Sequence, residues 1–129
     1  YEKMTITEVS KKYELSADTL RYYERIGLIP TVHRTSSGIR DYLEEDCNWV
    51  EFIKCMRSSG LPIEALIEYV TLFQEGDSSV DARKKLLIEQ RDLLAIKLEA
   101  MQTTLDRLNY KIKRYENGLM LKENKLTKL

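Results

Sequence analysis

The chain has 129 residues, and its 21 basic and 21 acidic side chains give a formal net charge of zero. This balance excludes a basic field over the whole protein, so any nucleic-acid surface has to be a local cluster. The length fits one domain, or one small domain with an extension. No apolar run approaches the roughly 18 residues of a membrane helix and no signal-peptide pattern is present, so we expect a cytoplasmic protein without membrane contact.

A helix-turn-helix is predicted near the start of the chain. Thr5 to Glu8 fits a capping box, and a short helix should follow to about Tyr13. Ser16 can cap a second helix from Ala17 to about Ile26, which Gly27 ends. Two short helices joined by about three residues are typical of a helix-turn-helix, although an ordinary helical hairpin has the same spacing.

Residues 28–42 predict a short two-stranded β-hairpin. Pro30 disfavours a helix in this segment, and the turn cluster Thr35–Gly38 precedes a second extended arm. Arg34 and Arg40 lie on the two arms. A basic hairpin directly after a helix-turn-helix is called a wing, and we expect it to reach the sugar-phosphate backbone of DNA.

Two further helices are predicted, from about residue 43 to 59 and from Pro62 to about Glu75. The first opens with three acidic residues, which suits a helix N-terminus. Its apolar side chains recur at i, i+3, i+4 and i+7, which indicates one buried stripe. The stripe consists of Trp49, Phe52, Ile53 and Met56. The acidic residues make this part of the chain negative, with 7 Asp/Glu against 2 Lys/Arg in residues 43–75.

Residues 79–118 predict one long helix with an apolar seam at 4-3 spacing, the pattern of a coiled coil. The seam consists of Leu94, Leu98, Met101, Leu105, Leu108, Ile112 and Tyr115. A helix of about 40 residues is roughly 60 Å long, too long to bury its stripe on a core of some 75 residues. The seam therefore needs a partner helix, most simply from a second copy of the chain. The predicted organisation is a DNA-binding domain (4–75), a linker (76–78), the coiled-coil helix (79–118) and a polar tail (119–129).

The segment SADTLRYYERIGLIP, with the hairpin GIRDY and the long C-terminal helix, resembles the MerR family of transcription regulators. The block WVEFIKCMRSSGLPIEALIEY is similar to its NmlR/AdhR-like subgroup, which responds to aldehydes and other electrophiles through one cysteine at the position of Cys55. The departures are small: Ile39 stands where an aromatic residue is usual, and Leu43 where a polar cap is frequent.

The resemblance implies a mainly α fold, a winged helix-turn-helix followed by an antiparallel coiled-coil dimer. It also implies a sequence-specific regulator that binds a pseudo-palindromic promoter spacer, bends and untwists it, and lets RNA polymerase engage both promoter elements. The N-terminal end of the second helix should enter the major groove, and cations and tyrosines should contact phosphates. The expected DNA-binding residues are Ser16, Ala17, Thr19, Arg21, Tyr22, Arg34, Arg40 and Tyr42.

Cys55 is the candidate sensor thiol. Helical spacing places it at the edge of the apolar stripe and its neighbours Lys54 and Arg57 on other faces, so a partner chain would have to complete its environment. Cys47 should project to the polar side. One alternative is a regulator that binds a small molecule non-covalently and has a structural Cys55. Another is a thiol redox protein, which lacks a resolving cysteine, and a coiled-coil adaptor would leave the wing unexplained. With one histidine and two cysteines, we expect no metal, cofactor or catalytic group.

Overall fold

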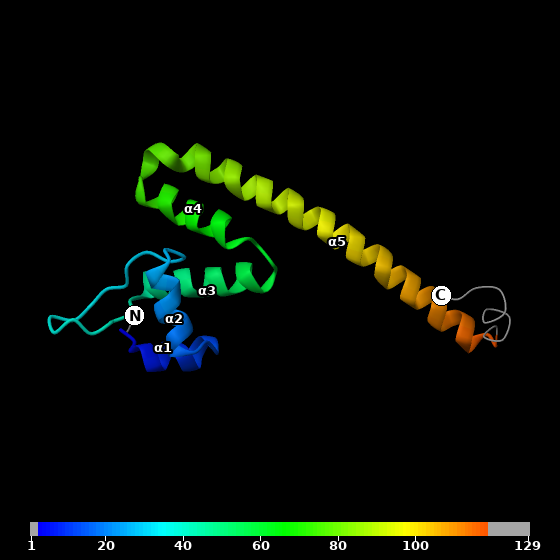
Figure 1. Cartoon of the computed structure of the whole chain (residues 1–129), viewed down its shortest axis with the longest axis horizontal. Helices are drawn as coiled ribbons and strands as arrows, with labels where there is room; N and C mark the ends of the chain where they lie inside the picture. The colour runs from blue at the N-terminus through cyan, green and yellow to red at the C-terminus, as the bar shows by residue number, and fades with distance from the viewer. Residues whose placement is uncertain (1–2, 119–129) are drawn as a thin grey trace. The chain divides into compact units, whose positions relative to one another are not determined.

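The computed structural model describes residues 3–118 and consists mainly of helices (Figure 1). The helices are α1 (Ile6–Tyr13), α2 (Ala17–Arg25), α3 (Glu44–Ser58), α4 (Ile63–Gln74), the 3-10 turn η1 (Asp77–Ser79) and α5 (Val80–Glu116). The chain divides between Gln90 and Arg91 into two compact units. The tail predicted for residues 119–129 lies outside the described residues.

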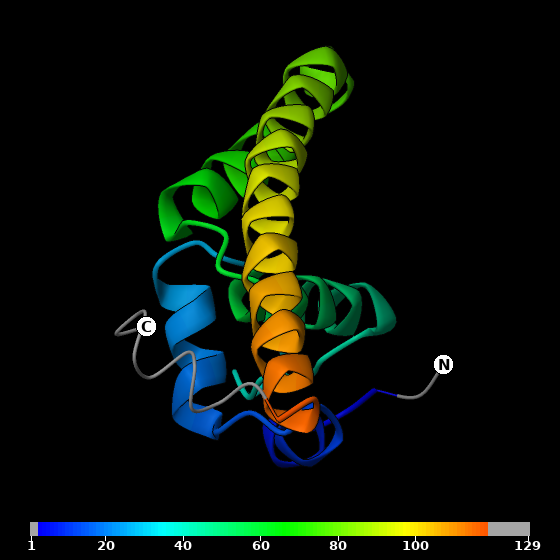
Figure 2. The same ribbon diagram turned by 90° about the vertical axis from the view of Figure 1, so that its right-hand side faces the viewer.

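The predicted helix-turn-helix is confirmed by α1 and α2, which lie side by side in Figures 1 and 2. At the start of α1 the backbone N–H of Thr5 donates to Glu8 Oε1 at 2.9 Å, and the backbone N–H of Glu8 donates to Thr5 Oγ1 at 3.2 Å. The α1 helix stops at Glu14, whose φ of 55° is left-handed. The helix boundaries are thus set by local capping groups, as the sequence pattern indicates.

The wing is present as a hairpin, but its arms do not form continuous strands. Arg34 and Arg40 make one antiparallel bridge. The turn is closed by the Thr35 N–H, which donates to the Ile39 carbonyl at 2.8 Å, while Gly38 has a φ of 87°. The predicted two-stranded ladder is therefore reduced to single bridges, because the arms are too short to add further pairs.

A second bridge ties the base of the wing to the start of the chain. The Met4 N–H donates to the Tyr42 carbonyl at 3.0 Å, and the Tyr42 N–H donates to the Met4 carbonyl at 2.8 Å. This pairing holds the second arm of the wing against the entry to α1. The wing therefore returns to the helical core on both sides of its turn.

The buried surface of α3 includes the predicted stripe but extends beyond it. Its buried side chains are Asp46, Cys47, Val50 and Ile53, whereas Trp49, Phe52 and Met56 are half-buried. The expectation that Cys47 projects to the polar side was wrong, since it is 1% exposed. The reason is that α3 is covered from two sides. The helix-turn-helix core covers the face of Val50, and α4 covers the face of Trp49.

The segment between α4 and α5 is structured. The buried Ser79 hydroxyl donates to the Leu72 carbonyl, and also to the Gly76 carbonyl at 2.8 Å. Arg83 Nε donates to Ser79 Oγ at 3.0 Å. Residues 76–78, which we expected to act as a linker, thus form part of a hydrogen-bonded corner at the start of α5.

His33 joins the first arm of the wing to the start of α3. Its Nδ1 lies 2.9 Å from Asp46 Oδ2, and its Nε2 lies 3.3 Å from Glu45 Oε1. The Asp46 carboxylate is 5% exposed and also accepts the Leu43 N–H at 2.9 Å, so it caps α3 in place of a polar residue at Leu43. The hydrogen bond to Asp46 is the main reason why the pKa of His33 is raised above its ordinary value of 6.5.

We expect the chain to be most stabilised by His33 in mildly acidic solution. A histidine whose pKa is raised on folding contributes stability that is fully present below its unfolded pKa and is lost as the pH rises through its folded pKa. The melting temperature of the wild type should therefore exceed that of His33→Gln most at about pH 5.5, and the difference should shrink towards about pH 8. Because His33 is the single histidine of the chain, no other imidazole contributes, and a difference that stays constant over this range would contradict the assignment.

Candidate nucleic-acid interface

The N-terminal end of α2 is organised by two hydroxyl groups. The Thr19 N–H donates to Ser16 Oγ at 3.0 Å, and the two side-chain oxygens lie 2.8 Å apart. Ser16 is exposed, while Ala17 and Thr19 are half-buried. The exposed end of the helix carries the positive end of the helix dipole, which favours an anionic partner.

The next turn of α2 presents a cation to solvent. Arg21 is exposed and pairs with Asp18 at 2.9 Å, and because both side chains are largely in water this pair is readily exchanged for another anion. Tyr22 is half-buried, and the guanidinium of Arg25 lies 5.5 Å from the centre of its ring. Tyr23 is buried, and burial raises its pKa. Of the two tyrosines, Tyr22 is thus the one whose ring remains accessible.

Glu24 connects α2 to both arms of the wing. Only 9% of its side chain is exposed. One carboxylate oxygen accepts Arg40 Nε at 2.6 Å and lies 3.7 Å from a terminal nitrogen of Arg34. The other accepts the Val32 backbone N–H at 3.0 Å. The two wing arginines are therefore held in place by a carboxylate of the helix that carries the candidate DNA-binding residues.

The sequence reading missed Glu24, although a signal was present. Leu20 and Glu24 are four residues apart and share a helix face, and Leu20 is fully buried. A carboxylate on that face needs a cation and hydrogen-bond donors. The two wing arginines, which we expected to contact only DNA, are such cations.

Tyr42 does not lie where it was predicted. It is fully buried, burial raises its pKa to about 12, and its hydroxyl makes no hydrogen bond within residues 3–118. Residues i and i+2 of an extended arm share a face, and the face of Arg40 and Tyr42 packs on the helices. Arg40 thus reaches Glu24 while Tyr42 enters the core, so its prediction as a phosphate contact was wrong.

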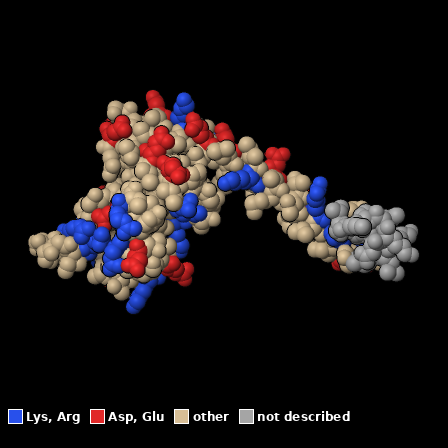
Figure 3. Space-filling view, in the orientation of Figure 1, with Lys and Arg blue, Asp and Glu red and all other residues tan. Residues whose placement is uncertain are grey.

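Charged side chains are unevenly distributed over the visible surface. Figure 3 shows Lys and Arg gathered over the wing and the first two helices, whereas Asp and Glu gather over α4 and the start of α5. This distribution agrees with the acidic count of residues 43–75 noted from the sequence. A local basic cluster, which a nucleic-acid surface on a chain of zero net charge would need, is therefore found around α2 and the wing.

Cys55 lies in the last turn of α3 and is exposed. Its flanking cations are engaged elsewhere: Lys54 Nζ donates to the Tyr13 carbonyl and Arg57 donates to the Leu61 carbonyl, both at 2.5 Å. The thiol is more accessible than its predicted place at the edge of the apolar face. As expected, the neighbouring charges of the same helix do not serve it.

The seam of α5 is exposed in the single chain. Its seven predicted side chains retain between 40% (Leu94) and 68% (Met101) of their surface. The others are Leu98, Leu105, Leu108, Ile112 and Tyr115. Such a continuous apolar stripe is unfavourable in water and is typical of an interface.

Other classes of site are not supported by the described residues. No three side chains of His, Cys, Asp or Glu gather there to hold a metal ion. None of the helices within residues 3–118 combines the length and apolar character that a membrane crossing requires.

Comparison with known proteins agrees with the geometry. Residues 4–72 match the profile described as MerR HTH family regulatory protein. The HTH-type transcriptional regulator AdhR of Bacillus subtilis (strain 168) is 64% identical over 91 residues, which are 70% of this chain and 65% of AdhR. The match thus spans less than two thirds of that relative.

Two solved structures share the fold. A protein from Listeria monocytogenes, described as a MerR family transcriptional regulator, has a TM-score of 0.88 and 48% identity, with 95% of this chain and 93% of that one covered. HiNmlR, a MerR family regulator lacking the sensor domain and bound to promoter DNA, has a TM-score of 0.81 and 26% identity, with coverage of 92% and 94%. From its capped α2 helix, its wing and these matches, the chain belongs to the MerR HTH family of regulatory proteins.

Proposed function

We propose that the chain acts as a homodimeric transcription regulator, not an enzyme, that binds a pseudo-palindromic promoter spacer and distorts it to activate transcription. The observation that carries this proposal is the Glu24 contact, which holds the wing cations on the C-terminal part of α2, the same helix whose N-terminal end is exposed. A helix end and a basic hairpin in fixed relation are what a winged helix-turn-helix needs to bind a groove and the adjacent backbone. HiNmlR, which shares the fold, is bound to promoter DNA.

Each candidate residue has a proposed role in this complex. Ser16, Ala17 and Thr19 approach base edges, and Arg21 and Tyr22 contact phosphate or base edges from α2. Arg34 contacts the backbone directly. Arg40 is more enclosed, with 23% of its side chain exposed, so its larger role is to hold the wing on Glu24.

The dimer follows from the exposed seam of α5. Full burial of a Leu, Ile or Met side chain contributes about 1.5–3 kcal/mol, so covering seven partly exposed seam residues outweighs the cost of association. An antiparallel pair of α5 helices would separate two copies of α2, as a pseudo-palindromic site requires. Distorting the spacer costs a few kcal/mol, and an effector must favour one dimer geometry by a similar amount.

We propose that the effector is an aldehyde or a related electrophile that modifies Cys55. The resemblance to the NmlR/AdhR-like subgroup, the 64% identity with AdhR and the exposure of Cys55 support this choice. With an aldehyde, Sγ bonds to the carbonyl carbon, and the π electrons of the C=O bond move to oxygen. The thiol proton is transferred to that oxygen, and the product is a hemithioacetal formed without oxidation. A cation that favours the thiolate would come from α5 of the second copy, because α5 carries 9 Lys/Arg against 6 Asp/Glu.

Arg34→Gln should weaken binding to the DNA upstream of the chain's own gene and to unrelated DNA by similar factors. A variant with one phosphate contact fewer releases fewer counterions from the DNA on binding. The slope of log K against log salt should therefore become shallower by about 0.9 per contact. Fluorescence anisotropy at several salt concentrations measures both quantities. Arg107→Gln, an exposed arginine outside the seam of α5, is the matched control. Loss of binding to the specific DNA alone, with an unchanged slope, would exclude the phosphate role of Arg34.

Leu105→Lys should disrupt the dimer, because it places a charge in the apolar seam. Sedimentation equilibrium should give twice the chain mass of 15.2 kDa for the wild type and a lower mass for the variant. Thr103→Lys lies on the opposite side of the heptad and should leave the mass unchanged. A wild-type protein that remains monomeric at micromolar concentrations would contradict the homodimer.

Cys55→Ser should abolish the response to formaldehyde in transcription in vitro from the promoter upstream of the chain's own gene. The affinity of the protein for that DNA should be unchanged. Cys47→Ala is the control, since Cys47 is shielded by burial and this variant should still respond. Equal activation of the wild type and Cys55→Ser would remove Cys55 from the mechanism. It would then favour a non-covalently bound effector.

A further inference from the structure

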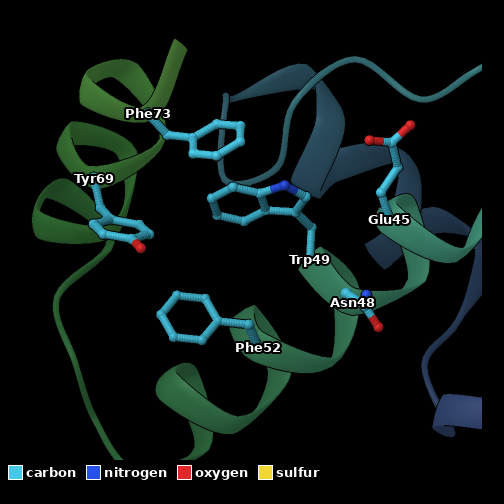
Figure 4. Close-up of a pocket in the computed structure, with 6 residues that line it drawn as sticks. All are labelled: Glu45, Asn48, Trp49, Phe52, Tyr69 and Phe73. Atoms are coloured by element: carbon cyan, nitrogen blue, oxygen red, sulfur yellow. The ribbon is translucent and has the colours of Figure 1, made fainter. Parts of the chain in front are cut away.

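A cavity of about 310 Å³ lies between α3 and α4, and none of its lining residues is assigned to DNA, to the dimer or to the sensor thiol. Figure 4 shows Trp49 at its centre, with rings from both helices around the indole and Glu45 on the side of the indole nitrogen. The lining residues are Glu45, Asn48, Trp49, Phe52, Tyr69 and Phe73. This volume is at the lower end of the range for small-molecule sites, and the mostly apolar lining with a few polar groups is typical of them.

The rings are arranged at angles and do not stack. The Trp49 centroid lies 5.0 Å from that of Phe73 and 5.9 Å from that of Tyr69, with interplanar angles of 72° and 55°. Phe52 lies 6.1 Å from Trp49 at 85°. The faces of aromatic rings carry negative potential and attract cations. The chain itself uses this attraction here, since the guanidinium of Arg83 lies 5.5 Å from the Phe73 centroid.

The charges around the cavity favour the same kind of ligand. Glu45 is the carboxylate of the lining, and 68% of its side chain is exposed, so it is available to a ligand. The facing groups that carry or gain charge are His33, 3.3 Å from Glu45, and Arg83 beside Phe73. Residues 43–75, which form both walls, have 7 acidic and 2 basic side chains. An anion would find no lining cation, whereas a cation would find ring faces and a carboxylate.

We propose that this aromatic cavity binds a small organic cation, an alkylated ammonium whose apolar substituents contact the rings and whose charge lies near Glu45. Binding of a cation in this cavity would be a role additional to the proposed DNA binding, and it does not depend on that proposal. It has a direct connection to the wing, because the Glu45 carboxylate that would serve the ligand also contacts His33. A bound cation therefore competes with the imidazole for Glu45, while Asp46 continues to hold the other imidazole nitrogen.

Trp49 is the single tryptophan of the chain, so its fluorescence reports on the cavity without a label. The wild-type protein, free of DNA, is titrated with choline and with its neutral isostere 3,3-dimethyl-1-butanol, at ionic strength held constant with NaCl. We expect a saturable change with choline and an affinity lower by about tenfold or more for the alcohol, because the alcohol has no charge to interact with the rings and Glu45.

Two variants, with Glu44→Gln as a control, test the residues around the cavity. Glu45→Gln should weaken choline binding several-fold, whereas Glu44→Gln, the neighbouring exposed carboxylate outside the lining, should leave it unchanged. His33→Ala should tighten binding at about pH 6, because it removes the competing imidazole. Both act on exposed side chains, and circular dichroism checks that the fold is retained.

Other outcomes would overturn the proposal. Equal affinity for choline and the alcohol, or no saturable change with either, would exclude a cation site. Trp49 emission that changes on protein dilution but not with choline would assign the cavity to a second copy of the chain. Because DNA is absent from these titrations, their failure would leave the DNA-binding proposal standing.

Discussion

One largely enclosed carboxylate links the DNA-facing parts of this protein. Glu24 lies on α2 yet accepts hydrogen bonds from Arg40 and from the backbone of Val32. The cost of burying a carboxylate is offset when it is paired and hydrogen-bonded, and removing one partner leaves an uncompensated charge. The wing has only one bridge between its arms, so its position depends more on this contact than on its own pairing. The spacing between α2 and the wing is thus maintained by an electrostatic contact.

The α3 helix supports this arrangement from behind and also forms a second surface. One face, with Val50 and Ile53, completes the core of the helix-turn-helix, and the other meets the rings of α4. Asp46 and Glu45, adjacent on its first turn, both contact His33 of the wing. The start of α3 therefore belongs to the wing base and to the aromatic cavity at the same time. A change at either place acts on the same short segment of backbone.

Local signals in the sequence predicted most of the elements, because their causes are local. The ends of α1 and α2 depend on Thr5, Ser16 and Gly27, whose capping groups act within a few residues. The heptad seam of α5 could likewise be predicted, since the spacing of the apolar residues alone defines it. The resemblance to a known family added the expected function and the antiparallel dimer, and the comparisons confirmed that family. The candidate DNA-binding residues on α2 came from the same motif.

Features that depend on distant packing were not predicted. Cys47 and Tyr42 were assigned to the surface from their immediate neighbours, yet both are buried, because α3 is covered on two sides and the second wing arm turns inward. Glu24 was overlooked because its partners lie 8 and 16 residues further along the chain. The pairing of Met4 with Tyr42 also depends on distant packing and was not predicted. It has a practical consequence. Lys3 lies beside the second wing arm, 3.7 Å from Asp41, so a fluorophore attached at Lys3 would report on the wing as DNA arrives.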